Sequence, residues 1–532
     1  MDSRLLDKKW YLYLTEFFSG MAVMAVELGA SRLLAPYFSS SQIVWTIIIG
    51  TIMIAMALGN VYGGLSSDKN PDPARLYRRL IIAAVWIAAI PVVGKYIIIA
   101  ITGLLIVSIS TNLLIWAAFI ACMVIFVFPL FLLGTVTPSL TKFATRSLSD
   151  NGRVVGSLGA ANTIGSIIGT FLPTFVTIPT VGTAITFLIF SGILLVIGIA
   201  YFLSIHKGYR GIAVSIILFL LCSALGNSDS FAFWEKNLTF EGESVYNYLQ
   251  VRDTPSSTIL STNVLFGVQS IKMKNDQLTG LYYDYALASP FMASLARKSD
   301  AKVLILGMGT GTFAGLCREF FPNSYIEGVE IDEKITSLAY EYFDLSPDIP
   351  VTTYDGRAYL NSIQEDYDVI MVDAYQDITI PFQMSSVEFF SLVRDHLKDD
   401  GVMVVNMNMR SNEEGNITDY LCDTIATCFD NVYTVDVKGS TNRELFASQN
   451  PEMLDLLSEG TASLKNQKLK AMMAEVSSSI VPYEAGNYIF TDDKAPVELL
   501  GMRVIDGIIG NEIGYFKEAY KRGGFQALLN LI

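Results

Sequence analysis

Seven long apolar segments fill the first 226 residues and restrict most of that half to helices. The segments cover residues 11–36, 43–65, 80–105, 112–136, 156–178, 183–204 and 211–226. A helix needs about 20 apolar residues to cross the hydrocarbon core of a bilayer, and the first six segments reach that length. The sequence therefore predicts a multi-pass α-helical membrane domain over residues 1–228, with about seven apolar segments.

The charge of the chain is divided between its two halves. Residues 1–227 carry 14 Lys and Arg against 7 Asp and Glu, and the remainder carries 23 against 44. The acidic half argues against nucleic-acid binding, because phosphate contacts need clustered Lys and Arg. It would attract small cations such as polyamines, although acidity also keeps proteins soluble. The five Cys have no metal-ligand spacing and there are only two His, so no metal site is expected.

A glycine-rich turn follows a predicted buried strand in the acidic half. The segment Val303–Gly311 reads as a strand, a turn containing Gly307, Gly309 and Gly311, and the start of a helix. Three further strand ends follow, and these ends carry Glu330 and Asp332, then Asp355 and Gly356, then Asp373. The carboxyl ends of parallel strands meet at one edge of an open sheet, where such folds bind nucleosides. Residues 291–450 are therefore predicted to form a Rossmann-like, S-adenosylmethionine methyltransferase-type parallel sheet.

The spacing of these motifs also indicates which nucleoside binds. Glycines let the backbone approach the ligand, and Glu330, about 20 residues further on, can hold two ribose hydroxyls. A dinucleotide fingerprint would have Gly or Ala where this chain has Thr312, and the Asp355-Gly356 pair suits an adenine ring. The pattern favours S-adenosylmethionine or a relative over NAD.

The supply of such a cofactor bears on the orientation of the chain in its membrane. Basic residues lie in alternate loops, which predicts a cytoplasmic amino terminus and a place in the inner or plasma membrane. If segment 211–226 spans, the acidic half lies outside the cell, where this cofactor is not expected. At about 16 residues the segment is short, and a re-entrant or interfacial position would keep the acidic half cytoplasmic. We favour the cytoplasmic side, although the count of spans disagrees.

The order of these motifs resembles the spermidine synthase family of aminopropyltransferases, and more closely its bacterial form fused to an amino-terminal multi-span domain. A linker and small β unit at 229–290 precede the sheet, and an extension at 451–532 is expected to pack on the catalytic domain. Two further segments carry the resemblance, Asp373-Ala374-Tyr375 followed by Ile380-Pro381-Phe382, and Thr491–Glu498.

The resemblance implies a role for individual residues. Asp373 would accept a proton from the attacking amine, because an ammonium ion is no nucleophile. Asn247 stands where the family has a Gln that contacts the cofactor, Glu330 would bind ribose, and Asp355-Gly356 would contact adenine. The reaction would pass an aminopropyl group from decarboxylated S-adenosylmethionine to an amine such as putrescine, with release of 5′-methylthioadenosine and without a metal.

The expected substrate contacts depart from the family pattern. They are Tyr282, Tyr283, Thr310, Gln376, Asp377 and Pro381. Thr310 stands where the family has Asp, Tyr283 where it has His or Gln, and Gln376 replaces a second acid, with Asp377 one position further on. Each lost contact between a carboxylate and a cation costs about 1.5–3 kcal/mol, so putrescine is in doubt as the acceptor while cofactor binding is not.

Two other functions remain open from the sequence. One is a methyltransferase that uses S-adenosylmethionine itself. The other is a polyamine transporter or sensor with a nucleoside-binding domain, suggested by Glu16, Glu27 and Lys95 inside the apolar segments. The expected partners are a small amine and membrane lipid but no nucleic acid, and homo-oligomer formation is left open.

Overall fold

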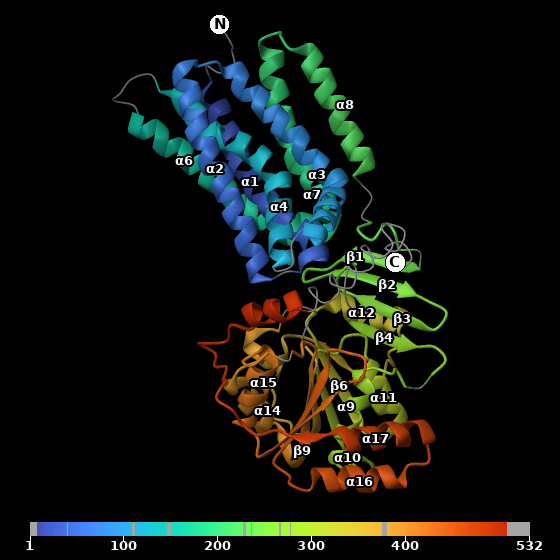
Figure 1. Cartoon of the computed structure of the whole chain (residues 1–532). Coiled ribbons are helices and arrows are strands. Elements are labelled where there is room, and N and C mark those ends of the chain that lie inside the picture. Colours follow the sequence, from blue (N-terminus) through green and yellow to red (C-terminus); the bar gives the residue numbers. More distant parts are fainter. Residues whose placement is uncertain are drawn as a thin grey trace. The chain divides into compact units, whose positions relative to one another are not determined.

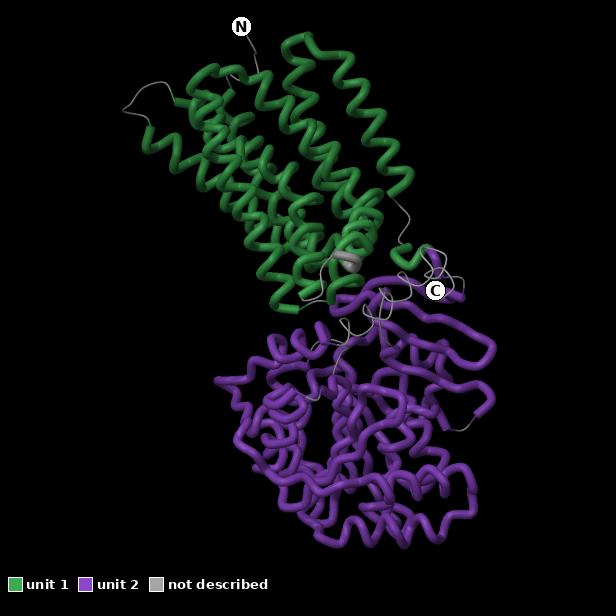
Figure 2. Tube along the Cα trace, viewed as in Figure 1, with its two compact units in different colours: residues 1–233 green, residues 234–532 purple. Residues whose placement is uncertain are grey.

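The chain folds into two compact units, Met1–Phe233 and Trp234–Ile532, which Figure 2 shows in different colours. The structure is a computed structural model, and it describes residues 8–507 except for residues 40, 109–111, 146–150, 227–229, 236, 265–267, 277, 375–379 and 412. The division between the units falls close to the end of the seventh apolar segment. The finer division into four regions stays a prediction.

The first unit consists of helices (Figure 1). They are α1 (Lys9–Phe38), α2 (Gln42–Lys69), α3 (Pro73–Ser108), α4 (Leu113–Gly134), α5 (Val136–Ala144), α6 (Asn151–Leu172), the π-helical turn η2 (Pro173–Thr177), α7 (Ile178–Ser204) and α8 (Tyr209–Leu225). Five continuous helical stretches in the described part are long and apolar enough to cross a membrane, and the last of them joins α6 to α7. Gly182, with φ 81°, interrupts that stretch, and α8 is shorter than the five.

Small residues allow close helix packing in this unit. A Cβ atom on Gly165 would lie 1.9 Å from the carbonyl oxygen of Phe17, and one on Gly169 would lie 2.2 Å from that of Met21. Helices α1 and α6 can therefore approach closely, as is common for helices inside membranes. Glu16 is buried near this contact, where one carboxylate oxygen accepts hydrogen bonds from Thr137 and Asn162.

The second unit begins with a small antiparallel sheet. Its strands β1 (Leu238–Glu243), β2 (Tyr248–Asp253), β3 (Ser257–Ser261) and β4 (Ser270–Met273) pair in chain order. Leu249, Val251 and Leu260 are buried on one face, where they pack with Ile335 and Leu338 of α12 (Glu333–Tyr342). The small sheet is thus joined to the larger sheet that follows by an apolar core.

The larger sheet has eight strands in the order β12-β10-β11-β9-β8-β5-β6-β7. Its strands are β5 (Lys302–Leu306), β6 (Tyr325–Glu330), β7 (Val351–Thr353), β8 (Tyr367–Val372), β9 (Leu397–Met407), β10 (Asn431–Asp436), β11 (Arg443–Ser448) and β12 (Val481–Pro482). Strands β5 to β9 pair in parallel, and β10, β11 and β12 extend the sheet in antiparallel fashion. The chain leaves β5 toward β6 and later returns to β8 on its other side, which makes a topological switch point between β5 and β8.

Helices cover both faces of this sheet (Figure 1). They are α9 (Tyr282–Ala286), α10 (Ala288–Met292), α11 (Thr312–Phe320), α12, α13 (Gly356–Ser362), α14 (Val387–Asp395), α15 (Ile417–Ala426), α16 (Met453–Ser463) and α17 (Gln467–Ser479), with the 3₁₀ turns η3 (Leu295–Arg297) and η4 (Phe382–Met384). Residues of β5 and β8 such as Val303, Ile305 and Met371 are fully or almost fully buried, and α16 and α17 contact α10 and α9. The expected fold class, apolar helices followed by a Rossmann-like sheet, is confirmed.

Candidate active site

The glycine turn lies against the end of β8. Gly307, Gly309 and Gly311 all have positive φ, at 89°, 53° and 81°. A Cβ atom on Gly307 would lie 2.6 Å from the carbonyl oxygen of Asp373 and 2.7 Å from the Cα atom of Ala374. Only glycine fits both that conformation and that contact. The turn therefore brings the backbone after β5 directly beside Asp373, at the switch point.

Glu330, the last residue of β6, holds the turn from the other side. Its Oε2 atom accepts a hydrogen bond from the backbone N–H of Gly309 at 2.9 Å, and its Oε1 atom accepts one from the N–H of Asp332 at 3.1 Å. Burial raises the pKa of Glu330 to about 6, and the charge of Asp332 adds to the increase. Each carboxylate oxygen has further lone pairs that can accept a ribose hydroxyl.

Asp332 connects the small sheet to the edge of the larger sheet that carries the predicted nucleoside contacts. It accepts hydrogen bonds from the Ser244 hydroxyl at 2.5 Å and from Asn247 Nδ2 at 3.0 Å, and it also caps α12 through the N–H of Lys334. The two predicted cofactor residues Asn247 and Asp332 are thus in direct contact. This contact fixes the loop before β2 beside Glu330.

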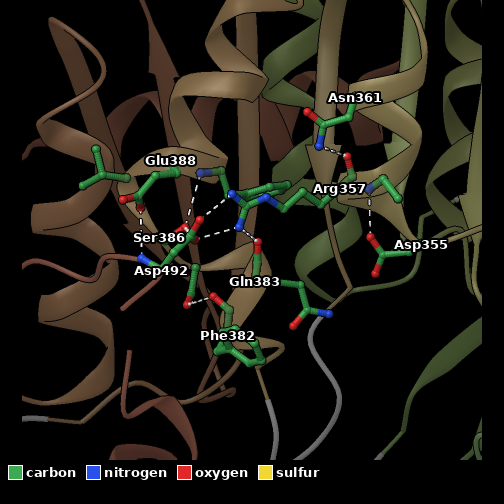
Figure 3. A network of polar contacts seen from close by, with 12 residues as sticks. Asp355, Arg357, Asn361, Phe382, Gln383, Ser386, Glu388 and Asp492 are labelled. Carbon is green, nitrogen blue, oxygen red and sulfur yellow. Dashed lines mark hydrogen bonds and ion pairs between the residues drawn. The ribbon is translucent and has the colours of Figure 1, made fainter. Parts of the chain in front are cut away.

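Asp355 and Gly356 form the start of α13. Asp355 caps this helix by accepting a hydrogen bond from the Ala358 N–H at 2.9 Å, and the side chain of Arg357 leaves the first turn toward the C-terminal segment (Figure 3). Arg357 forms two hydrogen bonds of 2.7 Å with the carboxylate of Asp492 and one of 3.0 Å with the carbonyl oxygen of Gln383. Arg357 therefore connects the expected adenine contact both to the segment around η4 and to Asp492 of the C-terminal segment.

We expect replacement of Asp492 by Asn to weaken nucleoside binding without abolishing it. The Arg357–Asp492 pair is partly exposed, so its loss should cost about 1 kcal/mol, which corresponds to a roughly fivefold higher Kd. Calorimetric titration with 5′-methylthioadenosine would measure this change. The matched control is Glu459→Gln, which removes the exposed Arg297–Glu459 ion pair and should leave the Kd unchanged. An unchanged Kd for Asp492→Asn would show that the pair does not position α13.

Asp373, directly after β8, has two side-chain partners. Its Oδ2 atom accepts a hydrogen bond from the Tyr282 hydroxyl at 2.7 Å, and its Oδ1 atom accepts one from Asn406 Nδ2 at 2.9 Å. Asn406 is oriented in turn by Asn442, whose Nδ2 donates to its Oδ1 at 2.7 Å. The side chain of Asp373 is half-buried, and both oxygens are held by neutral donors that leave lone pairs available.

The surroundings of Asp373 suit a general base. Burial, together with the nearby charge of Glu330, raises the pKa of Asp373 to about 7, although the hydrogen bonds from Asn406 and Tyr282 act in the opposite direction. A base with a pKa close to the working pH is ionised and still accepts a proton readily. Among the described residues, no Lys or Arg forms an ion pair with Asp373, Glu330 or Asp332.

These groups predict a specific pH dependence. The carboxylate form is required, so kcat/KM should rise with pH and level off above a midpoint near 7. Replacing Tyr282 by Phe removes a hydrogen bond that lowers the pKa of Asp373, so the midpoint should move to higher pH. A pH profile of both proteins would measure the shift, and a midpoint that stays in place or falls would contradict this assignment.

Thr310 lies in a cluster of hydroxyl groups next to the turn. Its hydroxyl is 2.6 Å from that of Ser270 on β4, and the Thr312 hydroxyl donates to the carbonyl oxygen of Ile271 at 2.7 Å. Tyr283 is buried, and its hydroxyl lies 3.4 Å from that of Ser270. Thr310 and Tyr283 thus connect the glycine turn to the small sheet, and their predicted role as substrate contacts stays a prediction.

Three predicted substrate contacts come from the chain between β8 and η4, and two further residues of the site were not predicted from the sequence. Pro381 is half-buried and precedes η4, whereas Gln376 and Asp377 are not among the described residues. Asn406 and Asn442 were missed. Asn406 lies within β9, one residue before the strand ends and directly after the apolar residues Val402–Val405, so its position near a strand end resembles the signal that identified Glu330 and Asp373.

Known proteins resemble this chain over the same regions. Residues 289–438 match the family model described as the spermine/spermidine synthase domain. A probable polyamine aminopropyl transferase from Bifidobacterium longum is 51% identical over 349 residues, which cover 62% of this chain and 77% of that protein. The chain belongs to the polyamine aminopropyltransferase family.

More distant members of this family are also similar. A polyamine aminopropyltransferase from Vibrio vulnificus is 27% identical over 284 residues, which cover 51% of this chain and 89% of that protein. The crystal structure of a probable spermidine synthase from Corynebacterium glutamicum aligns with a TM-score of 0.37 at 19% identity, and covers 47% of this chain and 96% of that one. The sequence relatives confirm the expected class of enzyme, an aminopropyltransferase-like transferase of polyamine biosynthesis.

Proposed function

We propose that this chain transfers the aminopropyl group of decarboxylated S-adenosylmethionine to a small amine, with Asp373 as the general base. The observation that carries the proposal is the position of Asp373, which lies at the switch point beside the glycine turn and has a pKa near 7. In this reaction the amine nitrogen forms a bond to the propyl carbon, the carbon–sulfur bond breaks, and the proton passes from the amine to Asp373. The sulfonium becomes the neutral thioether of 5′-methylthioadenosine.

The described residues fit a cationic donor. Glu330 and the backbone of the glycine turn would hold the ribose, and Asp355 with Gly356 would contact adenine. Carboxylates dominate the rest of the site, and no described Lys or Arg forms an ion pair with Glu330, Asp332 or Asp373. A positively charged aminopropyl chain is compatible with this field, whereas a methionine carboxylate would be repelled by it. The balance of charge favours the decarboxylated donor over S-adenosylmethionine.

The first unit supports a position at a membrane. Five apolar helical stretches long enough to span a bilayer precede the catalytic unit, and the last of them has 54 residues with a break at Gly182, which is enough for two crossings and an even total. We propose that they hold the enzyme in the bacterial inner membrane with the catalytic unit in the cytoplasm, where the donor is made. Protease digestion of spheroplasts and of inverted vesicles, followed by detection of the C-terminal unit, would test this orientation.

A matrix of two donors and several amines would test the proposed reaction. Purified enzyme should form 5′-methylthioadenosine only when both decarboxylated S-adenosylmethionine and an amine such as putrescine are present. Mass spectrometry of the nucleoside product distinguishes the alternatives. Formation of S-adenosylhomocysteine from S-adenosylmethionine would instead identify a methyltransferase.

A further inference from the structure

A buried carboxyl group on β11 has no role in the site described so far. The side chain of Glu444 has an exposed fraction of 0%, and neither of its oxygen atoms has a hydrogen-bond partner among the described residues. An isolated buried carboxylate is one of the most costly groups in a protein, and such groups usually occur where a cation or a proton compensates them. The position of Glu444 shows which cation that would be.

Glu444 lies in one row with the proposed base. It pairs directly with Asn406 across β11 and β9, and Val372 pairs with Val405 across β8 and β9, so Asp373 comes beside Asn406. Directly opposed residues project from the same face of a sheet, and the hydrogen bond from Asn406 to Asp373 identifies that face. Asp373, Asn406 and Glu444 therefore follow one another across three adjacent strands.

The spacing within this row suits a short molecule with two charges. Adjacent strands lie about 4.8 Å apart, so the backbones at Asp373 and Glu444 are separated by about 10 Å. Two carboxyl groups that project from such positions on one face can bracket a chain of a few carbon atoms. Asn406 lies between them and contributes only neutral groups.

Helix α9 packs against the strands that carry Asn406 and Glu444. This helix contacts both β9 and β11, and its first residue, Tyr282, donates to Asp373. An amine that replaces the Tyr282 hydroxyl on Asp373 would enter the row from this side. Burial and the charge of Asp373 raise the pKa of Glu444, so a bound ammonium group would exchange for a proton there.

We infer that Glu444 is the second carboxylate of the acceptor site and binds the distal ammonium group of a diamine whose other nitrogen lies at Asp373. This inference rests on the proposed aminopropyl transfer and deepens it. It also accounts for the sequence having Gln376 where the family has its second acid. A monoamine lacks the second ammonium group that Glu444 would bind, and should therefore be a poor acceptor.

Two acceptors and two variants test this role. With wild-type enzyme, 1,4-diaminobutane should have a KM about 10–100-fold below that of butylamine, the range expected for one charge-assisted contact. In Glu444→Gln and Glu444→Met this difference should disappear because the KM of the diamine rises, while the KM for the nucleoside donor and the kcat with butylamine stay the same. Replacing a buried carboxyl group by Met often preserves or increases stability, so this variant covers the case in which the amide does not fold.

The outcomes separate this role from its alternatives. An equal loss of kcat with both amines would mean that Glu444 only positions Asp373 through Asn406, and unchanged kinetics would mean a structural role; either result overturns the inference. Glu459→Gln, which removes the exposed ion pair with Arg297, is the control. Calorimetric titration of 1,4-diaminobutane reports binding without turnover, so the subsite is tested even if wild-type enzyme forms no 5′-methylthioadenosine and the proposed function fails.

Discussion

Replacing Asp373 by Asn should reduce turnover by about 10³-fold while nucleoside binding stays intact, because a general base contributes between 10² and 10⁴ to the rate. The amide has nearly the same shape, and it can still accept a hydrogen bond on its oxygen from Tyr282 or Asn406. It cannot take the proton that the attacking amine must lose. Steady-state kinetics with decarboxylated S-adenosylmethionine and a diamine would measure the loss.

The control for this substitution is Asp436→Asn. Asp436 ends β10 in the same sheet, where it forms surface ion pairs with Arg410 and Arg443. Its replacement should leave kcat within about twofold of wild type, since exposed ion pairs contribute about 1 kcal/mol or less to stability. A turnover for Asp373→Asn that equals the control would remove Asp373 from the mechanism.

Replacing Glu330 by Gln should have the second largest effect, and its main consequence should be weaker binding of the nucleoside. A carboxylate that accepts two ribose hydroxyls contributes about 1.5–3 kcal/mol for each charge-assisted hydrogen bond. The Kd for 5′-methylthioadenosine should therefore rise by at least about 10–100-fold. The amide would also lose one of the two backbone contacts, with Gly309 or Asp332, that orient the group.

Calorimetry with 5′-methylthioadenosine would measure this change directly. Glu333→Gln is the matched control, because Glu333 lies three residues further on, in the first turn of α12, and is exposed to solvent. Its Kd should equal that of the wild type. If Glu330→Gln binds the nucleoside as tightly as this control, the ribose site lies elsewhere on the sheet.

Local sequence was sufficient to predict the parts of the site that lie at strand ends. Buried runs such as Val303–Leu306 and Tyr367–Val372 indicate strands, and in a parallel sheet the residues after them must meet at one edge. The glycine turn, Glu330 and Asp373 follow from this rule. The apolar helices follow in the same way, because their length and composition leave few other structures.

Contacts between distant segments could not be predicted in this way. Asn442 orients Asn406 through an antiparallel pairing of β11 with β9, and no local pattern specifies that register. Glu444 occurs in a short strand of otherwise ordinary composition, so only the pairing shows that it lies in the row of Asp373. Likewise, Asp492 reaches Arg357 across 135 residues of sequence.

The most direct test of this account is the transfer of isotope from donor to acceptor. Decarboxylated S-adenosylmethionine labelled in its propyl carbons would be incubated with 1,4-diaminobutane and either wild-type enzyme or Asp373→Asn. The account predicts that wild-type enzyme moves the label into the amine product in equal molar amount to 5′-methylthioadenosine, and that the variant forms both products about 10³-fold more slowly. Label that stays in the donor with wild-type enzyme, or the same yield from the variant, would contradict it.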